Sequence, residues 1–268
     1  MFYGALEPKV DVRDYKIAAA GAEFPKAWQV EFLPDVKNQK SVGSCVAHAT
    51  SSILEYFNQQ ETGEYKKLST DFIYGMQGVK LNRAKPGMYL RDACKIVKEY
   101  GDCLKDTIST NTEQPKCTDM LNEILNEDIY KEAKIYQVLS YASCKTEKEI
   151  KHALMNYGPV LASMRWYDKN KVNGEIIEMD KTSDYGNHAI MIYGWNEKGW
   201  LCQNSWGKTW NNDGRFIIPY ADKLNEAWSF VDATNTDIKK PKRNNWLDIG
   251  YKIINMMINF FKSLGKSR

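Results

Sequence analysis

The chain has 268 residues, of which 43% are hydrophobic and 12% aromatic, enough for one large domain or two small lobes with a proper core. Its net charge of +3 is uneven, because residues 239–268 carry eight basic residues against one acidic, or +7, and residues 1–238 carry −4. An acidic body argues against nucleic-acid binding, which needs a basic face. No stretch approaches the roughly 20 consecutive apolar residues that cross a bilayer.

The first residues, MFYGALEPKVDVRDYK, include acids and Pro8 where a secretory signal is basic and then apolar. We therefore expect no export signal and a cytoplasmic location. The six cysteines show neither a CxxC pair nor zinc-finger spacing, so no metal site is expected, and no cofactor is predicted. A reducing compartment is the simpler inference, although Cys103 and Cys117 remain candidates for pairing across a loop.

The first half of the chain is rich in predicted helices. Residues 1–23 look like an irregular N-terminal extension. A buried helix is predicted from Cys45, with Ser44 as its N-cap, and it ends near Gly63. Two further helices are expected, one after the cap-like Ser69 and one over residues 90–100, stopped by Gly101.

The second half favours strands. Residues 134–139 read as a strand, and TEKEIKHALMNYG reads as a capped helix. PVLASMRWY and GRFIIPY alternate as strands do, and HAIMIYGW pairs with WLCQNSW in a predicted hairpin about residues 196–199. Helices followed by strands predict an α+β protein with two lobes.

The chain holds three histidines, and one of them has a candidate partner. His48 and His152 fit helix positions and read as structural. His188 enters an apolar strand, and Asn204 follows sixteen residues later on the neighbouring strand of the hairpin. A catalytic imidazole needs such a group to accept its N–H and fix its orientation. Trp206 is placed to shield that hydrogen bond from water.

These segments resemble the papain-like cysteine proteases. VKNQKSVGSCVAHA is similar to that family's active-site segment, and GNHAIMIYGW and WLCQNSWGKTWNNDGRFII are similar to its histidine and asparagine segments. The order Gln, Cys, His, Asn matches, and the similarity covers roughly residues 25–222. DVRDYK resembles a feature of microbial relatives that are poor in propeptide.

The resemblance implies a papain-like two-lobed α+β fold with a cleft between a helical lobe and a β-barrel-like lobe. The peptidase domain would cover residues 24–238, with the helical lobe at about 40–130 and the β lobe at about 131–222. Residues 239–268 would form a basic amphipathic C-terminal helix.

The resemblance also assigns roles. Cys45 would be the nucleophile of a cysteine endopeptidase, His188 its general base and acid, and Asn204 the group that orients His188. Gln39 would donate to the oxyanion together with the Cys45 backbone N–H. A helix N-terminus and an imidazolium are expected to lower the thiol pKa and give an ion pair at neutral pH. The products would form through a thioester acyl-enzyme.

Departures from the family pattern affect the substrate cleft. Val42 stands where the family usually has a cysteine, so one family disulfide is missing. Gly87 is the best candidate to contact the substrate backbone. The predicted substrate-binding residues are Gly87, Met88, Asn187, Ala189 and Trp206.

Two other functions are weighed against peptide hydrolysis. A Cys-His acyltransferase or amidase would use the same groups, and a degenerate member would serve as a peptide-binding module. The presence of all four residues of the Gln, Cys, His and Asn set argues against degeneracy. The expected partner is a protein or peptide substrate, with no nucleic acid.

The two ends of the chain are candidates for controlling access to the cleft, and the tail is also a candidate for docking. Only 44 residues precede Cys45, too few for the family's long prodomain, so we expect the first 20 or so residues or the basic tail to control access to the cleft. The tail's apolar stripe fits docking on its own domain, on an anionic membrane surface or on a partner protein.

Overall fold

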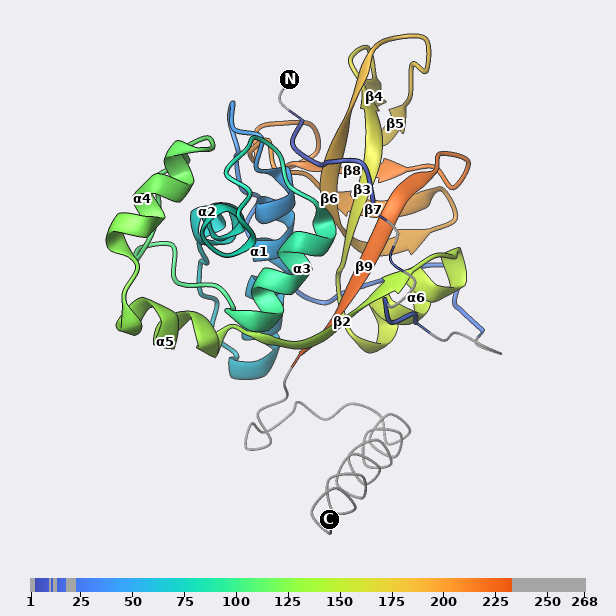
Figure 1. The fold of residues 1–268 in the computed structure, drawn as a ribbon. Helices are drawn as coiled ribbons and strands as arrows, with labels where there is room; N and C mark the ends of the chain where they lie inside the picture. Colours follow the sequence, from blue (N-terminus) through green and yellow to red (C-terminus); the bar gives the residue numbers. More distant parts are fainter. Residues whose placement is uncertain (1–2, 10, 12–13, 18–22, 233–268) are drawn as a thin grey trace. The chain divides into compact units, whose positions relative to one another are not determined.

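The computed structural model describes residues 3–232, except residues 10, 12–13 and 18–22. The predicted C-terminal helix over 239–268 lies outside the described residues. In Figure 1 the first five helices gather beside an antiparallel-rich sheet. The helices are α1 (Cys45–Thr62), α2 (Thr70–Leu81), α3 (Leu90–Glu99), α4 (Lys116–Ile124), α5 (Glu127–Ile135) and α6 (Glu147–Asn156). The strands are β1 (Trp28–Gln29), β2 (Val138–Cys144), β3 (Val160–Tyr167), β4 (Lys171–Asn173), β5 (Ile176–Glu178), β6 (Tyr185–Asn196), β7 (Gly199–Gln203), β8 (Arg215–Ile218) and β9 (Leu224–Asp232).

The predicted helix starts are confirmed, with one difference in capping. α1 begins at Cys45 and ends before Gly63, whose φ of 76° suits the left-handed C-cap. Ser44 stands at the N-cap, but its hydroxyl contacts His48 Nδ1 at 3.2 Å and makes no capping bond within the described chain. Ser69 caps α2 as predicted, accepting the Phe72 N–H at 3.0 Å.

The strand predicted over 134–139 is wrong in its first half. α5 continues to Ile135, and β2 begins only at Val138. The Ala133 carbonyl accepts the N–H of Asp102 at 3.2 Å, and Ala133 is fully buried, so tertiary packing holds this end of α5 in helical form. Strand propensity over such a short run is too weak to oppose that packing.

The strand order is β2-β9-β3-β6-β7-β8-β5-β4, and β1 pairs with β6. Over the described residues the sheet does not close on itself, so the expected β-barrel-like lobe is an open, strongly curved sheet. The predicted β6–β7 hairpin is confirmed, with Asn196 paired to Gly199. β6 lies inside the sheet, between β3 and β7, and α1 packs against it.

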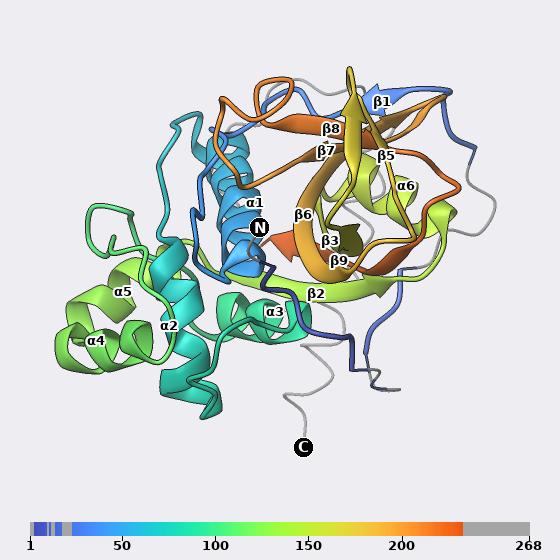
Figure 2. The ribbon, with the colours of Figure 1, turned by 90° about the horizontal axis from the view of Figure 1, so that it is seen from above.

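α1 is buried almost all round, as expected for a central helix. One core cluster joins α1, α2 and α3 to the face of the sheet that carries Ala189 and Met191. A second cluster fills the other side of the sheet under α6. Figure 2 shows α1 lying beside β6, and this packing fixes the N-terminus of α1 against that strand.

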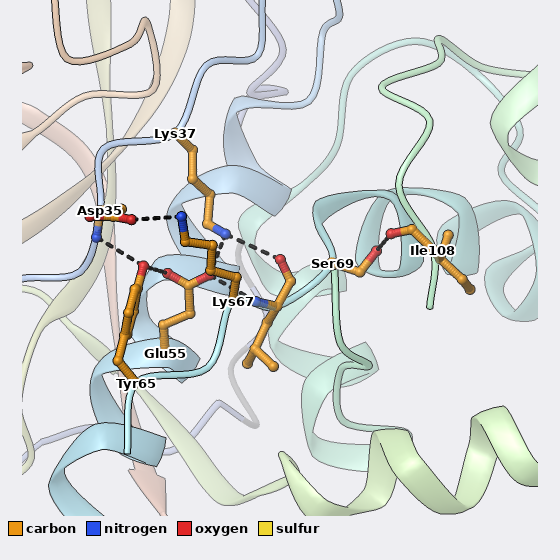
Figure 3. A network of polar contacts seen from close by, with 8 residues as sticks. Asp35, Lys37, Glu55, Tyr65, Lys67, Ser69 and Ile108 are labelled. Carbon is orange, nitrogen blue, oxygen red and sulfur yellow. Dashed lines mark hydrogen bonds and ion pairs between the residues drawn. The ribbon is translucent and has the colours of Figure 1, made fainter. Parts of the chain in front are cut away.

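A buried ion pair ties the loop before α1 to the helix itself (Figure 3). The fully buried carboxylate of Glu55 accepts from Lys37 Nζ at 2.5 Å, from the Leu68 N–H at 2.8 Å and from the Tyr65 hydroxyl at 3.0 Å. Lys37 also donates to the Leu68 carbonyl at 3.2 Å. The network holds the segment that leads to Cys45.

We expect Glu55→Gln to lower the free energy of unfolding by about 3 kcal/mol, the lower end of the range for a buried pair, because it leaves the Lys37 ammonium, whose side chain is 15% exposed, without its counterion. Denaturant unfolding measures the difference. Lys67→Gln is the matched control, since it breaks the exposed Lys67–Asp35 pair and should cost less than about 1 kcal/mol. Equal losses in the two variants would contradict the role of the buried pair.

Candidate active site

The site forms where the N-terminus of α1 meets β6. Cys45 is the first residue of α1, and its sulfur accepts the N–H of Ala189 at 3.4 Å. His188 precedes Ala189 on β6, and both Cys45 and His188 are fully buried. The packing of helix against strand therefore brings together two residues that are far apart in the sequence.

His188 has the partner that the sequence predicts. Its Nε2 lies 2.7 Å from Oδ1 of Asn204, which follows β7. Trp206 stacks on the imidazole with ring centroids 4.7 Å apart, and Trp166 meets it edge-on at 5.6 Å. The two indoles exclude water from the hydrogen bond, which strengthens it.

A neighbouring amide fixes which tautomer His188 adopts. The Ser205 N–H donates to Asn204 Oδ1 at 2.7 Å, so the atom that faces His188 must be the amide oxygen. An oxygen only accepts, and His188 Nε2 must therefore carry the proton. Nδ1 is then the basic nitrogen, and it has no hydrogen-bond partner among the described residues.

Ser205 also holds Gln39. Its hydroxyl donates to Gln39 Oε1 at 2.6 Å, and Gln39 Nε2 donates to the Val42 carbonyl at 2.9 Å. The Gln39 amide is thereby oriented in the loop before Cys45. The sequence analysis did not single out Ser205. Its only signal is its place directly after Asn204, where a backbone amide can meet the asparagine side chain.

The N-terminal segment of this same chain occupies the site. The Met88 N–H donates to the Gly4 carbonyl at 2.7 Å, and the Leu6 N–H donates to the Met88 carbonyl at 3.0 Å. Ala5 pairs with Met88 in a parallel bridge, and its N–H donates to the Asn187 carbonyl at 3.1 Å. In Figures 1 and 2 this dark blue segment passes over the junction of α3 and β6.

The segment fits closely and presents amides to the Cys45 sulfur. A Cβ on Gly4 would lie 1.9 Å from the Gly43 carbonyl oxygen, so no side chain fits there. The N–H groups of Gly4 and Ala5 face the Cys45 sulfur. Attack needs a carbonyl carbon at that place, and the segment therefore blocks the thiol instead of presenting it with a scissile bond.

Polar anchors hold the segment on both sides of the site. The Tyr3 hydroxyl donates to Asp168 at 2.6 Å. Further along, Arg91 pairs with Asp11 at 2.9 Å and with Asp14 at 2.6 Å. The sequence analysis described residues 1–23 as irregular, and it placed control of access either here or in the tail. The contacts support the N-terminal alternative, while the tail lies outside the described residues.

Gly87 and Met88, both predicted to bind substrate, differ in the partners of their backbone N–H and carbonyl groups. The N–H of Gly87 donates to the Tyr74 hydroxyl, and its carbonyl accepts from Gln77 Nε2, both at 3.1 Å. The backbone of Gly87 is thus engaged by α2. The backbone of Met88 binds the N-terminal segment, and the contact of Gly87 with a substrate backbone stays a prediction.

Burial sets the charge state of the reacting pair. It raises the pKa of the Cys45 thiol to about 11, against the opposing effect of the amides that face the sulfur. Burial also lowers the pKa of His188 to about 4, against the opposing effect of Asn204. The expectation of a lowered thiol pKa is wrong for this closed arrangement, because desolvation outweighs the N-terminus of α1. Both groups are neutral at pH 7.

The remaining cysteines are free thiols, so Cys103 and Cys117 are not paired. Within residues 3–232 as described, no cluster of three or more His, Cys, Asp or Glu side chains is arranged to hold a metal ion. In the same part of the chain, no helix combines the length and the apolar character needed to cross a membrane.

Comparisons with known proteins agree on one family. The family model for papain family cysteine proteases matches residues 25–228. Mouse cathepsin K is 27% identical over 201 residues, which are 70% of this chain and 56% of that protein, so the chain spans little more than half of this relative. An uncharacterized peptidase C1-like protein of Acanthamoeba polyphaga mimivirus is 25% identical over 83% of this chain and 76% of its own length. Xylellain, a cysteine protease from Xylella fastidiosa, has the same fold, with a TM-score of 0.74 and 21% identity over 86% of this chain and 96% of its own.

We expect Gly4→Leu to expel the N-terminal segment and to speed alkylation of Cys45 by iodoacetamide at pH 7 at least about tenfold. Opening restores solvent to the sulfur, which lowers its pKa and raises the thiolate fraction. Mass spectrometry of the Cys45 peptide gives the rate over a pH series, and the rise toward alkaline pH should begin at lower pH in the variant.

Glu7→Leu is the matched control, because it makes a similar change at an exposed position of the same segment. Its rate should stay within twofold of the parent. A rate for Gly4→Leu that equals the parent rate would contradict occlusion by this segment.

Proposed function

Because the chain belongs to the papain family of cysteine proteases, we propose that it is a cysteine endopeptidase that uses Cys45, His188 and Asn204. The observation that carries the proposal is the oxygen of Asn204, which accepts from both His188 Nε2 and the Ser205 N–H. It leaves Nδ1 of His188 as the basic nitrogen at the helix end where the thiol stands.

Acylation of the enzyme takes place in the opened site, after the N-terminal segment has left Cys45. His188 Nδ1 accepts the thiol proton as Cys45 Sγ attacks the peptide carbonyl carbon. The Cys45 N–H and the Gln39 amide donate to the oxygen as negative charge develops on it. The tetrahedral species collapses as the C–N bond breaks, and His188 gives its proton to the leaving amine. The acyl group remains on sulfur as a thioester.

Hydrolysis reverses the proton path. His188 Nδ1 takes a proton from water, which attacks the thioester carbonyl, and the proton then returns to the departing sulfur. Asn204 keeps the imidazole in one orientation through both halves, and Trp206 keeps water away from that hydrogen bond. Neither step changes an oxidation state.

The contacts of the N-terminal segment indicate how a substrate binds. The backbone of Met88 offers an N–H and a carbonyl to an extended peptide, and the Asn187 carbonyl offers an acceptor next to His188. Ala189 is buried beside Cys45 and lines the same place. A peptide that runs opposite to the N-terminal segment would use these groups and present a carbonyl to the sulfur.

Several expectations from the sequence remain proposals. They are a single peptidase domain over 24–238, a cytoplasmic location, a protein or peptide substrate, the absence of nucleic-acid partners, and docking of the tail on its own domain, an anionic membrane or a partner protein. Flotation of the full chain on anionic vesicles, with and without residues 239–268, separates the membrane alternative from the others.

Covalent labelling tests the proposed function. We expect a thiol-directed peptidyl epoxide to label the Gly4→Leu chain once, and to fail on the same chain with Cys45→Ala. Asn204→Ala should lower kcat on a peptide substrate at least about tenfold with a small change in KM, because it removes the orientation of His188 and not a substrate contact.

The alternatives give different results. If product forms only when an amine is added, the reaction is transfer of the acyl group to that amine and not hydrolysis. Absence of both labelling and turnover in the opened chain would overturn the enzyme proposal in favour of a peptide-binding module.

A further inference from the structure

Two glycine-containing segments form the walls of the site on the helical side. Gly43 stands two residues before Cys45, and Gly87 stands one residue before Met88, which binds the N-terminal segment. A Cβ built on Gly43 would lie 3.4 Å from the Gly87 nitrogen, so the two backbones nearly touch. Both glycines lie outside the helices and strands, and something else must fix the spacing between them.

One carboxylate reaches both walls. Glu113 Oε2 accepts the Gly43 N–H at 2.6 Å, and Oε1 accepts the hydroxyl of Tyr74 as well as the Gln114 N–H at 2.8 Å. The Tyr74 hydroxyl in turn accepts the Gly87 N–H at 3.1 Å. A single side chain therefore connects the nucleophile loop directly, and the peptide-binding segment through one hydroxyl.

The hydrogen bonds that Glu113 accepts are strong, and the Tyr74 side chain among them is buried. Hydrogen bonds to an ionised carboxylate are roughly twice as strong as neutral ones. Tyr74 is fully buried, and burial together with its bond to Glu113 raises the pKa of its hydroxyl, which stays protonated and donating. Val42, which replaces the family's usual cysteine, is buried next to Gly43 and cannot form a covalent link. The carboxylate restrains the same loop without a disulfide.

We propose that Glu113 is a positioning residue that sets the distance between the nucleophile loop and the backbone of Met88. The inference rests on the proposed function, because it concerns how that site holds a peptide against Cys45. Gln77 completes the restraint by donating to the Gly87 carbonyl. The backbone groups of Met88 are then held ready for an extended peptide, as they are for Gly4 and Leu6.

The two branches of the connection predict different kinetics. Tyr74→Phe removes the acceptor of the Gly87 N–H and one donor to Glu113, but it keeps the bond from Gly43 to Glu113. It should raise KM about three- to tenfold and leave kcat within twofold, since the looser Met88 backbone weakens the binding of substrate and transition state alike. Glu113→Gln leaves one acceptor oxygen for three donors, the Gly43 N–H, the Tyr74 hydroxyl and the Gln114 N–H, and also loosens the loop next to Cys45. We expect it to raise KM about tenfold and to lower kcat at least threefold.

All variants are made in the full chain with Gly4→Leu, so that the N-terminal segment competes equally weakly in each. Glu132→Gln is the matched control: its carboxylate also accepts a backbone N–H in the helical lobe, that of Leu104 at 2.6 Å, but it touches neither wall of the site. It should lower the melting temperature to a similar extent and leave both KM and kcat within twofold. Equal kinetic losses in Glu132→Gln and Glu113→Gln, or unchanged kinetics in Glu113→Gln, would overturn the proposal.

Peptide binding gives a second measurement that needs no turnover. A synthetic peptide of residues 1–9 is titrated into the same chains carrying Cys45→Ala. Glu113→Gln should weaken binding about tenfold, and Glu132→Gln should leave it within twofold. Failure of the parent to hydrolyse any peptide would reject the proposed function alone, whereas equal affinities in the two variants would reject the role of Glu113.

Discussion

The chemistry of this site depends on the backbone amide of Ser205. That amide takes one lone pair of the Asn204 side-chain oxygen and so prevents the side chain from turning its nitrogen toward His188. The positions of the proton and of the basic lone pair on His188 follow from this restraint. The proton lies on Nε2 and the basic lone pair lies on Nδ1, which under the proposed function accepts the proton of the Cys45 thiol. The same serine orients Gln39 through its hydroxyl, so one residue holds the two side chains that flank the reacting pair.

Close packing aligns the pair and also keeps it uncharged. The Ala189 N–H contacts the Cys45 sulfur and so joins β6 to α1. The N-terminal segment, bound to Met88 and Asn187, covers the sulfur from the other side. Water is then excluded from both groups, which shifts the pKa of the thiol up and that of the imidazole down. In this closed arrangement the Cys45 thiol and the His188 imidazole are therefore both uncharged at pH 7. Readmission of solvent removes the desolvation that separates the two pKa values, and so it shifts both groups toward their charged forms.

The sequence predicts the local helices and the hairpin of this arrangement, and it also predicts the pairing of His188 with Asn204. Helical periodicity after Gly43-Ser44, the cap at Ser69 and the strand-turn-strand pattern about residues 196–199 predict elements that the structure contains. The spacing of His188 and Asn204 predicts their pairing because a hairpin leaves few alternatives. Contacts made through the backbone are different. Nothing in the residue types announces that Ser205 donates its amide, or that Gly4 lies against Gly43. Charge states are equally hidden, because the burial that decides them is a property of the assembled lobes.

Nitrogen NMR of the histidine side chains can show whether His188 is neutral and carries its proton on Nε2. The chain has three histidines, so labelled protein and a His188→Gln variant suffice to assign the signals. At pH 7 the account predicts the neutral Nε2–H form for His188, with the imidazolium appearing only as the pH falls toward about 4. An imidazolium at pH 7, or a proton on Nδ1, would contradict it.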